Sequence, residues 1–285
     1  MVRTGAMAFP RQISGIPLRS QYHELRPDVV YAEAGGEPLR FDHYRPLGVK
    51  KPAPVVVVVH GGAWVGGDPS QAAGNALHFV RHGIATVSVS YRLAPVHRFP
   101  APLDDVRHGL RWVRAHAAEL GVDADRIALM GLSAGAHLAV LAHLAGDLEE
   151  LTPDLPADLR DVPETVRAVI AHYGPYDLGR RRSEMIEALL GPRGEDAAWV
   201  GMASPLTHAA RAAAPVLLIH GTGDQVVSWR ESDRLHAALE AAGKSSQLLL
   251  LEGAPHAFQV DWRGEANRRA NAAMDAFLDR HLLPG

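Results

Sequence analysis

The chain of 285 residues contains no cysteine, which excludes disulfides, thiolate metal sites and a cysteine nucleophile. Its first 15 residues, MVRTGAMAFPRQISG, lack the apolar core of a secretory signal, and no segment reaches the length of a membrane helix. The formal net charge is only −3, so there is no strong field of one sign to attract nucleic acid. We therefore expect a cytoplasmic protein that binds neither nucleic acid nor a membrane. The sequence leaves its oligomeric state open.

Metal-ligand motifs are also missing, although the chain has 16 histidines. The histidines are scattered, and none belongs to an H-E-x-x-H pattern or a similar tight cluster of ligands. We therefore expect no catalytic metal.

What the chain does have is an alternation of short β-branched runs with helix-length amphipathic segments. This alternation is typical of an α/β protein with a mostly parallel central sheet and helices on both faces. We expect one domain over residues 1–285, with antiparallel edge strands before residue 45 and a central strand at the valine run that begins at Val55. The expected strands are 55–60, 84–91, 126–130, 166–172, 215–220 and 247–252, and the expected helices are 71–82, 103–120, 133–145, 229–242 and 264–281.

Two connections are longer than the others, at about 147–165 and 174–214. Long insertions over the carboxyl edge of a sheet often form lids or pocket walls. We expect these two segments to form a small cap over the functional site.

The pentapeptide Gly131-Leu132-Ser133-Ala134-Gly135 lies between an expected strand and an expected helix. This is the G-x-S-x-G order of a nucleophile elbow, in which a strained turn exposes a serine hydroxyl and the glycines let strand and helix approach. The pentapeptide alone is equally compatible with a Gly-Ser turn in a Rossmann-like protein.

An acid and a base follow in the expected order. Asp224 comes directly after one expected strand and His256 after the next, so both are predicted to lie at the carboxyl edge with Ser133. A serine nucleophile needs such a base, and the base needs an acid to hold it in the right tautomer. Taken alone, Asp224 can be a turn former and His256 an ordinary loop histidine.

A glycine-rich loop follows the valine run as His60-Gly61-Gly62-Ala63-Trp64. Backbone N–H groups that point at a developing oxyanion stabilise acyl transfer. We expect the oxyanion hole to come from Gly62 and Ala63 with Ala134, and the register between Gly61, Gly62 and Ala63 stays open by one residue.

These motifs together resemble the α/β-hydrolase fold esterases of the BD-FAE-like (bifunctional feruloyl and acetyl esterase) and hormone-sensitive-lipase-like branches. The resemblance covers about residues 40–282 and implies a carboxylic-ester hydrolase that acts on small-molecule esters without a cofactor. The hormone-sensitive-lipase branch has HGGG and GDSAG where this chain has Ala63 and Leu132, which favours the BD-FAE-like branch. Only about 55 residues precede the central strand, so the N-terminal cap of the lipase-like branch is expected to be reduced here and the pocket to be more open. The matching motifs are HGGAW, YRLAP, FPAPLDD, GLSAG, SPLT, HGTGD and PHAF.

Three apolar residues beside these motifs are candidates for the substrate pocket, namely Trp64, Leu132 and Phe258. Aromatic residues at such places serve equally often as core.

Other functions compatible with these residues are a kynurenine-formamidase-like amide hydrolase and an acetyl or feruloyl esterase acting on polysaccharide. The missing secretory signal argues against an extracellular polymer as substrate. A ligand-binding module without catalysis is the remaining alternative, but it would be expected to lack part of the triad or the oxyanion loop.

Overall fold

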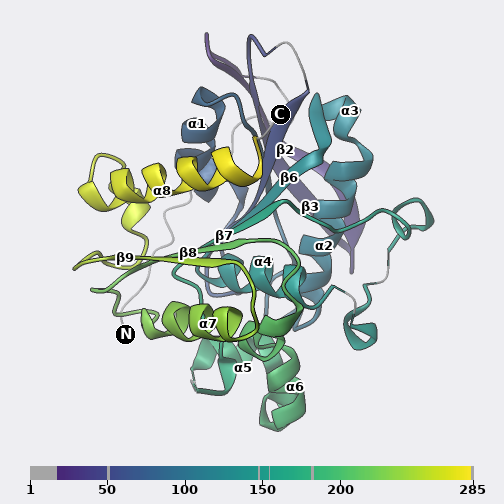
Figure 1. The fold of residues 1–285 in the computed structure, drawn as a ribbon. Coiled ribbons are helices and arrows are strands. Elements are labelled where there is room, and N and C mark those ends of the chain that lie inside the picture. The colour runs from purple at the N-terminus through teal and green to yellow at the C-terminus, as the bar shows by residue number, and fades with distance from the viewer. Residues whose placement is uncertain (1–17, 50–51, 147, 154, 181–182, 284–285) are drawn as a thin grey trace, which may run out of the picture.

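A computed structural model describes residues 18–49, 52–146, 148–153, 155–180 and 183–283 of the chain. These residues form one sheet of nine strands in the order β1-β2-β3-β5-β4-β6-β7-β8-β9 (Figure 1). The strands are β1 (Leu18–Arg19), β2 (His23–Ala34), β3 (Glu37–Pro46), β4 (Ala53–Val59), β5 (Ala85–Val89), β6 (Val122–Leu132), β7 (Ala168–His172), β8 (Val216–Gly221) and β9 (Ser246–Leu251).

The sheet is antiparallel at its N-terminal edge and parallel elsewhere. β1, β2 and β3 pair in antiparallel fashion, and β3 pairs with β5 in the same way. Every pair from β5 through β4, β6, β7 and β8 to β9 is parallel. The predicted mostly parallel sheet with antiparallel edge strands is confirmed for the described residues, and the expected lead-in before residue 18 lies outside them.

The five valines of β4 show why this strand is central. All five are fully buried, because helices cover both faces of the sheet. Val55, Val57 and Val59 pack in one cluster with residues of α2 (Ala101–Ala115) and α4 (Ala134–Leu144). Val56 and Val58 pack on the other face with residues of α1 (Ala73–Arg81) and α8 (Glu265–His281).

The segment expected as one helix over 103–120 is two helices. α2 ends at Ala115, and α3 (Ala117–Leu120) begins after His116. The carbonyl oxygen of Trp112 accepts from the backbone N–H of His116 and also lies 2.9 Å from its Nδ1 atom, so His116 caps the end of α2. The other expected helices appear close to their predicted bounds, with α7 at Arg230–Ala241.

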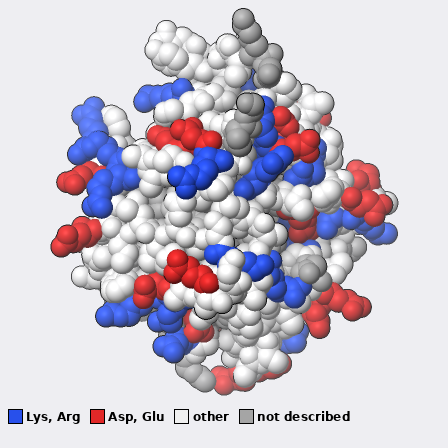
Figure 2. All heavy atoms as spheres, in the orientation of Figure 1, with Lys and Arg blue, Asp and Glu red and all other residues white. Residues whose placement is uncertain are grey.

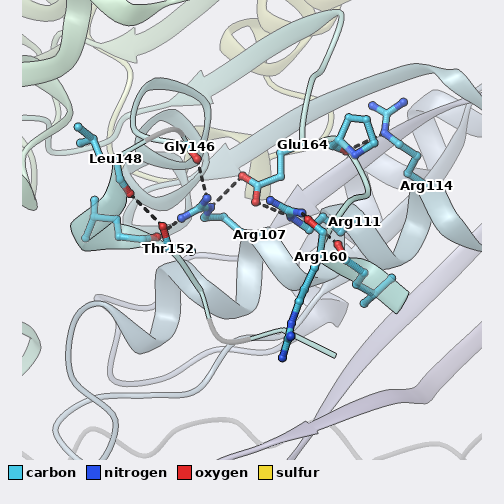
Figure 3. Close-up of polar contacts among 11 residues, drawn as sticks. Arg107, Arg111, Arg114, Gly146, Leu148, Thr152, Arg160 and Glu164 are labelled. Carbon is cyan, nitrogen blue, oxygen red and sulfur yellow. Dashed lines mark hydrogen bonds and ion pairs between the residues drawn. The ribbon is translucent and has the colours of Figure 1, made fainter. Parts of the chain in front are cut away.

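The connection between α4 and β7 lies at the amino edge of the strands, so its prediction as a lid is wrong. It leads from the end of α4 into the first residue of β7, and arginines of α2 hold it there (Figure 3). The guanidinium of Arg107 lies 2.8 Å from Glu164 and donates to the carbonyls of Gly146 and Leu151. Arg111 lies 2.6 Å from the other oxygen of Glu164. A segment clamped against α2 in this way cannot cover the opposite edge.

The surface carries charges of both signs. Figure 2 shows acidic and basic side chains interspersed around a broad uncharged area on the face drawn. None of the helices in the described ranges has the length and apolar character needed to cross a membrane.

Candidate active site

Ser133 occupies a sharp turn between β6 and α4. Its backbone has φ 53° and ψ −117°, a sparsely populated region for a side chain with a Cβ. Its N–H donates to the carbonyl oxygen of His172 over 2.9 Å, which holds the turn against β7. A Cβ at Gly135 would overlap the carbonyl oxygens of Val59 and His60, so only glycine lets α4 approach β4 this closely. These are the features of a nucleophile elbow.

The structure brings Ser133, His256 and Asp224 into one chain of hydrogen bonds. The Nε2 atom of His256 lies 3.0 Å from the hydroxyl oxygen of Ser133, and its Nδ1 atom lies 2.6 Å from Oδ2 of Asp224. The three residues follow the carboxyl ends of β6, β8 and β9. Both distances are within hydrogen-bond reach, as a nucleophile, a base and an orienting acid require.

The surroundings of Asp224 keep its carboxylate ionised. Burial alone would raise its pKa, but hydrogen bonds from His220, His256 and the backbone N–H of Val227 outweigh burial and hold the pKa far below its usual range. Its Oδ1 accepts from the backbone N–H groups of Val226 and Val227 at 2.8 Å each. The carboxylate is therefore fixed in place and charged at neutral pH.

His220 contacts the carboxylate of Asp224, and the sequence analysis did not single it out as a site residue. Its Nε2 atom lies 3.0 Å from the carbonyl oxygen of Val227 and 3.2 Å from Oδ2 of Asp224. Both neighbours only accept, so Nε2 carries the hydrogen, and Nδ1 accepts from the hydroxyl of Ser232 at 2.8 Å. The sequence could have indicated this residue, because His220 opens the HGTGD motif four residues before Asp224.

The glycine-rich loop after β4 adopts an unusual backbone that leaves its amides free. Gly62, Ala63 and Trp64 have φ of 120°, 53° and 63°. The N–H groups of Gly62, Ala63 and Ala134 have no hydrogen-bond partner in the described part of the chain. A Cβ built on Gly61 would lie 3.4 Å from Cβ of Ser133, so the loop runs directly beside the elbow.

The three residues considered as pocket walls are buried, which corrects that interpretation. Trp64, Leu132 and Phe258 are only 2 to 3% exposed. The indole N–H of Trp64 donates to Nδ1 of His137 over 3.2 Å, and Nε2 of the same imidazole lies 2.7 Å from the carbonyl oxygen of Ala203. Trp64 therefore anchors the glycine-rich loop after β4 to α4 rather than facing an open pocket.

Tyr173 packs against the imidazole of His256, a contact that the sequence analysis missed. The two ring centroids are 4.6 Å apart, and the Tyr173 hydroxyl donates to the side-chain oxygen of Gln259 over 2.6 Å. Tyr173 directly follows β7 and has φ 43°. No local motif marks this position, because the contact depends on how β7 and the loop after β9 meet.

The second segment that the sequence analysis predicts as a lid follows β7. It contains α5 (Glu184–Leu190) and α6 (Ala197–Met202). Glu231 of α7 anchors its start by accepting from the N–H groups of Tyr176 and Asp177, at 2.9 Å each. A cavity of about 390 Å³ lies within this segment, lined by residues between 177 and 207, and the triad residues are not among them.

Comparison with known proteins shows which family the chain belongs to. The BD-FAE family model matches residues 41–239. Esterase LipC of Mycobacterium tuberculosis is 34% identical over 222 residues, covering 74% of this chain and 54% of LipC. Esterase LipQ of the same organism is 32% identical over 266 residues, covering 90% of this chain and 62% of LipQ. The chain thus spans a little over half the length of these curated relatives.

The solved structure of the thermophilic esterase Est2 from Thermogutta terrifontis, with propionate bound, superposes with a TM-score of 0.77. It is 27% identical and the match covers 90% of this chain and 96% of Est2. The agreement extends over sheet and helices together, so the expected α/β-hydrolase fold is confirmed. Because the family model matches most of the chain and Ser133 occupies a nucleophile elbow, the chain belongs to the BD-FAE family.

Proposed function

We propose that this protein is a serine carboxylic-ester hydrolase that works through an acyl-enzyme. The observation that carries the proposal is the hydrogen-bond chain from Ser133 through His256 to Asp224. The esterase names of LipC, LipQ and Est2 support it. An ionised Asp224 beside a serine-bound imidazole has the arrangement that acyl transfer needs.

In the proposed reaction, the Ser133 oxygen attacks the ester carbonyl carbon while Nε2 of His256 takes the hydroxyl proton. Asp224 stabilises the imidazolium that forms. The free N–H groups of Gly62, Ala63 and Ala134 donate to the carbonyl oxygen as it becomes negative. His256 then gives its proton to the departing alcohol as the C–O bond breaks. In the second half, His256 activates water, which attacks the acyl carbon and releases the acid and Ser133.

The substrate we propose is a small or short-acyl ester. The segment with α5 and α6 follows the carboxyl end of β7, which supports the proposal that it forms a small cap over the site. Est2, which carries propionate in its solved structure, supports a short acyl chain by analogy. These steps use no cofactor, and a cytoplasmic location stays a prediction from the sequence.

Hydrolysis of p-nitrophenyl esters from acetate to palmitate tests the proposal, with wild type and Ser133→Ala compared side by side. We expect turnover of the short esters, a cutoff at longer chains and a loss of at least about 1,000-fold in Ser133→Ala. The thermal midpoint of the variant should stay close to wild type. Undiminished turnover by Ser133→Ala would overturn the assignment of the nucleophile.

N-formylkynurenine is the parallel substrate, because a formamidase uses the same triad on an amide. Fast deformylation with negligible ester turnover would move the protein to the amide hydrolases. Absence of turnover on both substrates would favour a ligand-binding module.

A further inference from the structure

Helices α1 and α8 cover the same face of the sheet (Figure 1). Three ligand-type side chains, none of them in the triad, meet where these two helices lie together. His78 lies on α1, His82 follows its last residue, and Asp275 lies on α8. The Nε2 atom of His78 is 2.7 Å from Oδ1 of Asp275, and Nε2 of His82 is 3.9 Å from Oδ2. One ligand atom from each of the three side chains lies within 4.8 Å of the other two.

The two histidines present the right atoms for an ion. They are four residues apart, so they project from the same side of the helix end, and their rings lie 4.7 Å apart. The Nδ1 atom of His82 lies 3.0 Å from the carbonyl oxygen of His78. A carbonyl only accepts, so Nδ1 carries the hydrogen and Nε2 keeps its lone pair. Metal-bound histidines are commonly oriented in this way by a carbonyl on the other ring nitrogen.

We propose that His78, His82 and Asp275 form a binding site for a divalent transition ion of the Zn²⁺ type. Ligand atoms at about 2.0–2.2 Å from a tetrahedral zinc lie roughly 3.3–3.5 Å from one another. The two Nε2 atoms lie 2.7 and 3.9 Å from different oxygens of Asp275, and one ligand atom of each side chain lies within 4.8 Å of the other two. Side-chain rotations that bring these atoms together by up to about 1.5 Å would therefore form the site. On binding, the ion takes the place of the proton between His78 and Asp275, which goes to solvent.

The types of the three ligands and the exposure of their side chains indicate which ions would bind. Two imidazoles and one carboxylate favour Zn²⁺, Co²⁺ or Ni²⁺ over Mg²⁺ and Ca²⁺, which prefer oxygen. The side chains of His78, His82 and Asp275 are 18%, 48% and 32% exposed. The ion can therefore enter from solvent and complete its coordination with water.

The position of the site indicates a role in stability rather than in ester hydrolysis. His78 and His82 lie at the end of α1 that leads into the first residue of β5, whereas the triad follows the carboxyl ends of β6, β8 and β9. A bound ion would link α1 to the C-terminal helix α8. Sequence alone could not find the site, because His78 and Asp275 are separated by 197 residues.

Calorimetric titration of the untagged, chelator-treated full chain with Zn²⁺ tests the proposal. We expect one ion per chain, no binding of Mg²⁺ under the same conditions, and a thermal midpoint raised by about 5 °C at a hundredfold excess over Kd. His82→Gln and Asp275→Asn should each lower the Zn²⁺ affinity at least about tenfold. Turnover of p-nitrophenyl acetate at 25 °C should be the same with and without the ion.

His236→Gln is the matched control. His236 and Glu240 form a histidine–carboxylate pair on α7 at 3.6 Å, but this pair belongs to no three-ligand group among the described residues. The control should bind Zn²⁺ as wild type does. Absence of stoichiometric Zn²⁺ binding, or equal affinity in wild type, His82→Gln and Asp275→Asn, would overturn the site. Circular dichroism would establish that both variants are folded before the affinities are compared.

Discussion

The two edges of the sheet are built in opposite ways. At the carboxyl edge, the loops contain five of the six non-glycine residues with positive φ in the described ranges, namely Ala63, Trp64, Ser133, Tyr173 and Ala257. At the amino edge, the connection after α4 is held by arginines that donate to carbonyls and to Glu164 (Figure 3). Strained backbone persists only where the surroundings hold it. The hydrogen-bonded amino edge supplies rigidity, and the strained carboxyl edge holds the residues of the proposed active site.

The amino edge depends most on Arg107. Its side chain is 2% exposed, and it bridges Glu164, Gly146 and Leu151. A buried charge with this many partners is costly to leave half paired. The comparison therefore predicts that changes at one edge act on turnover and changes at the other act on stability.

The largest effect is expected from Asp224→Asn. An amide cannot stabilise the imidazolium of His256 and favours the wrong tautomer, so kcat should fall about 1,000- to 10,000-fold. Asn can still accept from Val226 and Val227, so the thermal midpoint should change far less. Asp233→Asn on the exposed side of α7 is the control for loss of a charge and should keep wild-type kcat. Full activity of Asp224→Asn would remove this residue from the site.

Arg107→Ala should act on the other edge. Removing the guanidinium takes one partner from Glu164 and leaves the carbonyls of Gly146 and Leu151 without their donor. The free energy of unfolding should therefore drop by about 3–5 kcal/mol. Urea unfolding measures this loss, while kcat of the folded variant should stay within about twofold of wild type. Arg269→Ala, an exposed position on α8, should change stability little. A large loss of kcat in Arg107→Ala without loss of stability would contradict the division between the edges.

Gly62→Ala should lower kcat about 100-fold, the typical cost of one lost oxyanion donor. The residue has φ 120°, and a Cβ there would overlap the carbonyl oxygen of Gly66, so the loop must shift its amides. Separate values of kcat and KM for p-nitrophenyl acetate show where the loss falls. Gly74→Ala is the control, because a Cβ at that helical position meets nothing within 4 Å. Wild-type kcat in Gly62→Ala would indicate that the oxyanion donors lie elsewhere.

The effect of pH is shared by several buried imidazoles. Burial lowers the pKa of His60 and His137 to about 4 and, with His220 adding to it, that of His172 to about 3. Their folded pKa values lie below the unfolded value of about 6.5, so the unfolded chain binds protons first as the pH falls. Stability is therefore fully present above about pH 6.5 and declines toward pH 4. Each imidazole contributes at most about 1.4 kcal/mol per pH unit.

Two carboxyls, Asp42 and Asp104, work against this decline. Burial raises the pKa of both, that of Asp104 to about 7, so their stabilising contribution is present below the unfolded pKa and is lost as the pH rises through the folded pKa. Urea unfolding at pH 7.5, 6 and 4.5 should still show a net loss toward acid, since burial lowers the pKa of His43 and His143 to about 4 as well. His137→Gln should flatten the profile. Stability that rises steadily from pH 7.5 to 4.5 would show that these imidazoles are protonated in the folded protein.

The sequence predicted the triad because its motifs encode local backbone geometry. Ser133, Asp224 and His256 each follow a recognisable strand, and the parallel sheet brings such ends together. The burial of Trp64 could not be read in the same way, because its partner His137 is 73 residues away. The connection at about 147–165, wrongly predicted as a lid, did carry a sequence signal of its true position, which its length alone does not reveal. A connection that leaves a helix and enters a parallel strand must lie at the amino edge.

The imidazole of His137 gives its hydrogen to the carbonyl of Ala203 and its lone pair to Trp64. The segment after β7, which we propose as a cap, and the glycine-rich loop after β4 are therefore joined through a single ring. Transplanting a different cap from a relative would move the donors for the reacting carbonyl as well as the pocket wall. A chimera in which the backbone carbonyl of residue 203 stays in place should retain the wild-type turnover rate and change its substrate selectivity. The side chain at position 203 is free to vary, because the contact with His137 is made by the carbonyl.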